Sequence, residues 1–169
     1  MDRALKIIDK ISHWSGIVGA SLLPALIFVT FFEVIRRYAF NAPTAWSFET
    51  AMFLNGTMVF LGGAYCLRYG LHVNVDVLYE RWSPKYKAVV DMITFPLLVL
   101  LCLTLVWPGG KALWYSLQPP WEASSTPWGP VLWPVRGAII IGGLLLFFAG
   151  AAKFIRDLRI IISRTKPNV

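Results

Sequence analysis

The residues best suited to chemistry form a charged stretch, EVIRRYAFNAPTAWSFE, at residues 33–49. Glu33 precedes Arg36 and Arg37 by three and four residues, so the three side chains share one face if a helix continues that far. Glu49 stands at the start of the next apolar run, where its charge suits the positive end of a helix. Because charges near a bilayer are costly unless paired or hydrated, this pattern predicts ion pairing at a membrane edge.

The same stretch predicts a compact corner between two helices. Asn41 and Pro43 in the tetrapeptide NAPT both interrupt a helix. Two uses stay open: the corner only closes a hairpin, or it also docks a partner protein. The candidate residues of this structural corner and partner interface are Glu33, Arg36, Arg37, Tyr38, Asn41, Pro43, Trp46 and Glu49.

Long apolar runs must position this corner. Hydrophobic residues make up 57% of the 169 residues, above the roughly 45–50% of soluble domains. Charge-free runs cover residues 11–32, 50–67, 92–110 and 137–152, each close to the about 20 residues that cross a bilayer as a helix. The first run exceeds a signal-peptide core, so it is expected to stay uncleaved. We predict an all-α membrane protein, one domain over residues 1–169, with four transmembrane helices at about 13–35, 48–68, 88–110 and 133–155.

The basic residues predict the orientation of these helices. Only four of the 16 lysines and arginines fall in the first and third loops: Arg36, Arg37, Lys111 and Arg136. The remaining lysines and arginines lie in the N-terminal segment, the second loop and the tail. Because the chain crosses the membrane twice between each of these segments and the next, all three lie on the same side. The positive-inside rule therefore predicts an N-in/C-in topology, with the corner facing out. The net charge of +7 is explained by topology and contact with membrane lipids, so no nucleic-acid partner is expected.

The second loop predicts an amphipathic interfacial helix at about 71–82, between the second and third transmembrane helices. Leu71, Val75, Leu78 and Trp82 follow helical spacing on one face. Ser83 and Pro84 then suit the N-cap and first turn of the third transmembrane helix. The candidate residues here are His72, Asp76, Trp82, Ser83 and Pro84.

The sequence offers few groups for catalysis. It has no nucleophile motif, HExxH, phosphate-binding glycine loop or CxxC, and its cysteines, Cys66 and Cys102, lie in separate apolar runs. We expect no catalytic residue, no metal site and no cofactor. Polar residues at mid-membrane depth are also scarce, so no substrate path is evident and a supporting role is favoured over a carrier.

Two motifs resemble a known family. Arg37, Tyr38, Phe40, Asn41, Pro43, Trp46 and Glu49 match an Arg-Tyr-x-Phe-Asn-x-Pro stretch before Trp and Glu; His72, Val73, Val75, Asp76, Ser83 and Pro84 match a His-Val-x-Val-Asp stretch before Ser-Pro. Together with Ile155, Arg156, Asp157 and Leu158, they resemble the small (DctQ-type) membrane subunit of tripartite ATP-independent periplasmic (TRAP) transporters. The third loop follows the family's Trp/Pro character only loosely.

The resemblance implies a multi-pass protein of the bacterial inner membrane that is not an enzyme. Such a small permease subunit scaffolds a large elevator-type permease subunit and helps to dock a periplasmic solute-binding protein. Uptake is symport driven by an ion gradient, usually sodium, and substrates are organic acids such as C4-dicarboxylates or sialic acid. Two other classes remain open: a self-contained four-helix channel or carrier, and a membrane enzyme or redox subunit.

Overall fold

The computed structural model describes residues 2–70 and 84–163, and all regular structure in these ranges is helical. Four long helices follow one another: α1 (Asp2–Tyr38), α2 (Ser47–Arg68), α4 (Pro84–Ser116) and α5 (Trp133–Ser163). Each contains a stretch long and apolar enough to cross a membrane. The prediction of an all-α protein with four membrane-spanning helices is therefore confirmed.

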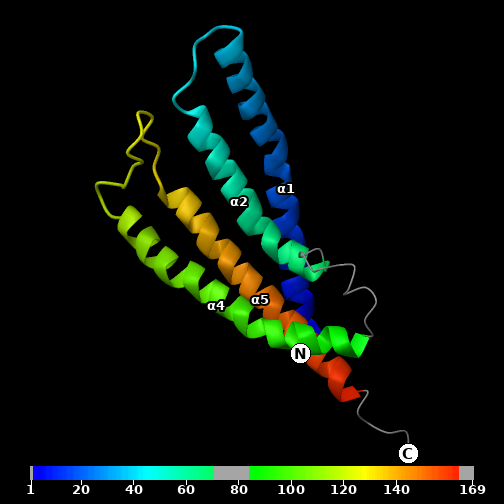
Figure 1. The fold of residues 1–169 in the computed structure, drawn as a ribbon. Coiled ribbons are helices and arrows are strands. Elements are labelled where there is room, and N and C mark those ends of the chain that lie inside the picture. The colour runs from blue at the N-terminus through cyan, green and yellow to red at the C-terminus, as the bar shows by residue number, and fades with distance from the viewer. Residues whose placement is uncertain (1, 71–83, 164–169) are drawn as a thin grey trace, which may run out of the picture.

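The helices lie side by side in the order α1, α2, α5, α4 (Figure 1). The connections α1–α2 and α4–α5 lie at one end, called here the loop end. The start of α1 and the end of α5 lie at the opposite end, called here the terminal end. Two helical hairpins thus meet along the contact between α2 and α5, while α1 and α4 occupy the outer positions.

Glycines permit the closest approaches between these helices. A Cβ on Gly142 of α5 would lie 2.6 Å from both the Cβ and the carbonyl oxygen of Phe60 in α2. A Cβ on Gly16 of α1 would overlap the Tyr65 ring of α2. Since real side chains do not approach so closely, the absence of a Cβ at these two positions allows the helix separation observed.

The buried core is small and sits where α2, α4 and α5 meet. Its buried members are Ala64, Leu67, Cys102, Leu146 and Ala149. In the most apolar window of α5, 39% of residues are buried, against 6–11% in the other three helices. Most large apolar side chains of α1 and α4 are therefore exposed, which suits contact with lipid or another membrane protein.

The helices extend beyond the predicted crossings. α1 begins at Asp2 and ends at Tyr38, and α4 continues through Pro96 and Pro108 to Ser116. α2 and α5 begin at Ser47 and Trp133, close to their predicted starts. The predicted interfacial helix, with His72, Asp76, Trp82 and Ser83, lies outside the described residues. The N-in/C-in orientation stays a prediction.

Candidate functional site

The corner, residues 33–49, is built from the end of α1, a short turn and the start of α2. α1 stops at Tyr38, and Asn41 then adopts a φ of 46°. The Ala42 amide donates to the Arg36 carbonyl at 3.0 Å, which satisfies a backbone acceptor at the helix end. Asparagine tolerates this left-handed conformation better than most residues, so NAPT suits the reversal.

Glu33 holds the two sides of the corner together. Its carboxylate accepts hydrogen bonds from the Thr44 hydroxyl at 2.6 Å and the Thr44 amide at 3.2 Å. It also accepts from Arg37 Nη2 at 3.0 Å, one helical turn away. One carboxylate thus ties the last turn of α1 to the connection into α2.

The other predicted corner residues have different surroundings. Trp46 stacks on Phe32, with 5.9 Å between ring centroids, and Tyr38 is 81% exposed. Arg36 does not join the Glu33 pair: its Nε is buried and, within the described residues, has no hydrogen-bond partner. Pro43 is exposed. The corner therefore presents Arg37 and Tyr38 outward and keeps Glu33 as the internal acceptor.

Glu49 is buried by the connection between α4 and α5. It lies in the first turn of α2 and is only 8% exposed. Ser124 Oγ donates to Glu49 Oε1 at 2.5 Å, and Thr126 Oγ1 donates to Glu49 Oε2 at 2.7 Å. A buried carboxylate with hydrogen bonds to both oxygens is far cheaper than an unpartnered one. We call this arrangement, Glu49 with Ser124 and Thr126, the latch.

The connection that forms the latch, residues 117–132, is itself fastened to α5. Glu122 forms a bidentate pair with Arg136, in which Nη2 donates to Oε1 at 2.7 Å and Nη1 contacts Oε2. Arg136 Nη1 also donates to the Ala112 carbonyl of α4 at 2.8 Å. The hydrogen bond from Arg136 holds the pKa of Glu122 below its usual value. Trp121 and Trp128 are exposed on this connection.

A second polar network lies at the terminal end. Arg156 Nη2 donates to both carboxylate oxygens of Asp9 at 2.7 Å, joining α5 to α1. Arg68 of α2 approaches the same carboxylate, with 3.9 Å between its Nε and Oδ1, and donates to the Asp9 carbonyl. Asp9, Arg68 and Arg156, called here the terminal network, thus connect three helices.

Sequence reasoning missed the latch, the Glu122–Arg136 pair and the terminal network. It placed Glu49 correctly at the start of a helix but gave it no distant partner. A weak signal was present, since Glu122 is the lone carboxylate in a Trp- and Pro-rich segment and Asp9 stands among lysines. An isolated carboxylate in the sequence indicates that the residue has an interaction partner, but it does not show which residue that partner is.

The arrangement can position helices and present surfaces. Among residues 2–70 and 84–163, no three His, Cys, Asp or Glu side chains gather so as to hold a metal ion. Cys66 and Cys102 are free thiols. Some charged side chains at each end tie helices together, such as Glu122 with Arg136 and Asp9 with Arg156, while the spans between them are mainly apolar.

Residues 26–160 match the family described as tripartite ATP-independent periplasmic transporters, DctQ component. The chain is 28% identical over 102 residues to a protein of Haemophilus influenzae named as a TRAP transporter small permease protein, covering 60% of this chain and 61% of the relative. It is 30% identical over 88 residues to the C4-dicarboxylate TRAP transporter small permease protein DctQ of Vibrio cholerae serotype O1, covering 48% of this chain and 38% of the relative.

The match contains both halves of the latch, the corner and most of the α2–α5 contact, while Asp9 of the terminal network lies before it. Both relatives are named as small permease proteins, and the four apolar helices suit a multi-pass location in the inner membrane. The chain belongs to the DctQ family of TRAP transporter components.

Proposed function

We propose that this chain is the small, non-catalytic permease subunit of a TRAP transporter and that it scaffolds a large permease subunit. Family membership over residues 26–160 carries the proposal. The fold supports it because α1 and α4 expose wide apolar faces, while ion pairs connect neighbouring elements at the two ends. A protein that supports a moving neighbour needs rigid connections and needs no substrate site of its own.

The corner and the 117–132 connection are the proposed docking region for a periplasmic solute-binding protein. They lie together at the loop end, since Glu49 binds Ser124 and Thr126. Arg37, Tyr38, Trp121 and Trp128 are exposed there. Exposed arginine and aromatic side chains are enriched at protein interfaces, which favours this region over the apolar sides. The proposal requires the loop end to face the periplasm.

The proposed transport reaction is uptake of organic acids driven by a sodium gradient. The Vibrio cholerae relative is named for C4-dicarboxylates, so small dicarboxylates are the first substrates to test, followed by sialic acid. In this arrangement the ion and substrate sites belong to the large subunit.

Reconstitution tests the proposal. The chain, its large subunit and the matching binding protein are combined in liposomes, and uptake of labelled C4-dicarboxylates is measured under an imposed sodium gradient. We expect uptake only when all three components are present, and none when potassium replaces sodium. Transport by the isolated chain would contradict the proposal and favour a self-contained carrier or channel.

A further inference from the structure

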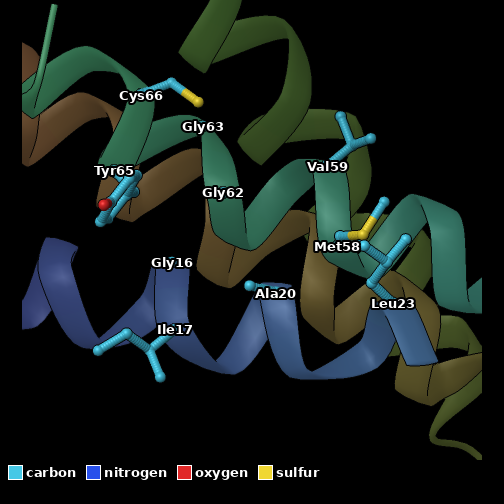
Figure 2. A pocket seen from close by; sticks show the side chains of 10 residues that line it. All are labelled: Gly16, Ile17, Ala20, Leu23, Met58, Val59, Gly62, Gly63, Tyr65 and Cys66. Atoms are coloured by element: carbon cyan, nitrogen blue, oxygen red, sulfur yellow. The ribbon is translucent and has the colours of Figure 1, made fainter. Parts of the chain in front are cut away.

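The α1–α2 hairpin carries an apolar groove of about 750 Å³ in its middle. Gly16 and Ala20 of α1 and Gly62 and Gly63 of α2 line it, together with larger side chains such as Ile17 and Leu23. Figure 2 shows the two helices running along each other here, with Tyr65 extending from α2 beside Gly16. A volume in this range is typical of small-molecule pockets.

A second, polar cavity of about 320 Å³ lies nearer the start of α1. Its lining consists of Lys6, Asp9, Lys10 and His13 from α1, and Arg68 and Tyr69 from α2. Three of these side chains are cations and one is a carboxylate. This cavity and the apolar groove are formed by the same two helices.

Helical spacing aligns the two cavities. Lys6, Lys10, His13, Ile17 and Ala20 follow one another at intervals of three or four residues, so they form a single face of α1. The face therefore changes along the helix from cationic through an imidazole to apolar.

A cluster of three aromatic rings, Tyr65, Tyr69 and His13, lies between the apolar groove and the polar cavity. Tyr65, which lines the groove, lies 4.5 Å from the Tyr69 ring and 6.0 Å from the His13 ring between centroids. Tyr69 Oη and His13 Nδ1 are hydrogen-bonded at 3.0 Å. Side chains with an apolar body and a polar tip are typical of the depth at which headgroups meet acyl chains.

The polar cavity has an excess of positive charge. Its carboxylate, Asp9, is already bound by Arg156 at 2.7 Å from outside the cavity. Lys6 and Lys10 are exposed, and no ion pair among the side chains that the structure describes, which exclude that of Asp2, includes either of them. The three cations that line the cavity thus exceed its single carboxylate, and an anion there would meet two exposed lysines.

We propose that the α1–α2 hairpin binds an anionic phospholipid, with its phosphate in the polar cavity and an acyl chain in the groove. Lys6, Lys10 and Arg68 bind the phosphate, and Tyr69 and His13 lie beside the glycerol esters. Basic pockets between transmembrane helices recognise anionic headgroups in this way. An acyl chain would fill the apolar groove. Because the groove and the polar cavity are neighbours on the same two helices, one phospholipid molecule can place its phosphate in the cavity and its acyl chain in the groove. The proposal does not depend on the proposed transport function.

Native mass spectrometry of the full-length chain in detergent tests this site. Phosphatidylglycerol and phosphatidylcholine with identical acyl chains are added in equal amounts, and the retained lipid is quantified. We expect a preference for phosphatidylglycerol. The double variant Lys6→Gln/Lys10→Gln should reduce that preference by about 20-fold to 30-fold, since each lysine near an anionic headgroup contributes about a fivefold effect. Lys6→Arg/Lys10→Arg should preserve it, and so should Lys111→Gln on α4.

A matched pair of glycines tests the groove. A Cβ on Gly62 or on Gly56 meets nothing within 4 Å, so leucine can be introduced at either position without a clash at Cβ. Gly62 lines the groove and Gly56 does not. We expect Gly62→Leu to reduce retention of both lipids about tenfold, as roughly two methylene groups lose their apolar contact, and Gly56→Leu to leave it unchanged.

Three results would overturn the proposal. One is equal retention of the two lipids by the native chain. Another is displacement of the bound lipid by millimolar inorganic phosphate alone, which would show an anion site without a chain site. The third is a Gly62→Leu variant that retains lipid normally but no longer co-purifies with the large subunit, because a partner helix would then be the occupant of the groove.

Discussion

Glu49 and Ser124, 75 residues apart in the chain, are joined by a hydrogen bond of 2.5 Å that closes the α4–α5 connection over the start of α2. This contact links the two hairpins at the loop end. At the terminal end the Asp9–Arg156 pair joins α1 to α5. The hairpins are thus tied by polar contacts at both ends and by close helix packing between them.

The latch should contribute measurably to stability. Replacing the buried carboxylate in Glu49→Gln removes a charged acceptor from two hydroxyl donors, and we expect a loss of about 1–3 kcal/mol. Thermal unfolding in detergent measures the effect. Ser125→Ala, an exposed serine beside the latch, is the matched control and should unfold like the native chain. Equal stability of Glu49→Gln and Ser125→Ala would contradict the prediction.

Gly142 should be intolerant of any side chain. The methyl group of Gly142→Ala must displace Phe60 of α2, because the new Cβ would lie 2.6 Å from its backbone carbonyl. Overpacking of this kind costs about 1–3 kcal/mol. Gly137→Ala, on the same helix with nothing within 4 Å, should gain up to about 1 kcal/mol from helix propensity. We therefore expect Gly142→Ala to lower the unfolding temperature and Gly137→Ala to raise it. Similar effects of the two variants would show that α2 and α5 can move apart at Gly142 without cost.

Reversal of Arg37 should affect assembly more than folding. The Arg37 side chain is 57% exposed, and an exposed pair such as Arg37–Glu33 contributes about 0–1 kcal/mol. We therefore expect Arg37→Glu to insert and unfold nearly as the native chain does. Co-purification with the large subunit and uptake in the presence of binding protein should fall about tenfold, as expected for loss of about 1.4 kcal/mol at an interface. Normal yield and normal uptake would exclude a docking role for this residue.

The Glu122–Arg136 pair should weaken in acid. Since the folded-state pKa of Glu122 is lowered, its contribution is fully present above about pH 4.5, the usual value, and is lost as the pH falls through the lowered pKa. The unfolding temperatures of the native chain and Glu122→Gln should therefore differ at pH 7 and converge as the pH falls through the lowered pKa of Glu122. A difference that is independent of pH would show that the carboxylate is not the group responsible.

The four helices were predictable because each is encoded locally: about 20 consecutive apolar residues can satisfy their backbone in a bilayer only as a helix. The Glu33–Arg37 contact is local in the same sense, at one helical turn. Ser124 and Thr126 were not predictable as partners of Glu49. They lie in a loop, and no helical or strand periodicity relates loop residues to a carboxylate 75 and 77 positions away in the sequence. The order α1, α2, α5, α4 was equally hidden, since it depends on which glycines meet across helices.

The arrangement as two hairpins has a consequence for synthesis. The α1–α2 hairpin leaves the ribosome before α5 exists, so the surface of Phe60 that later receives Gly142 first meets acyl chains. Asp9 likewise cannot form its ion pair with Arg156 until that residue, 147 positions later in the chain, has been synthesised. The contacts between the hairpins can therefore form only once α5 has been made, so the last helix to be synthesised completes the packing of the first two.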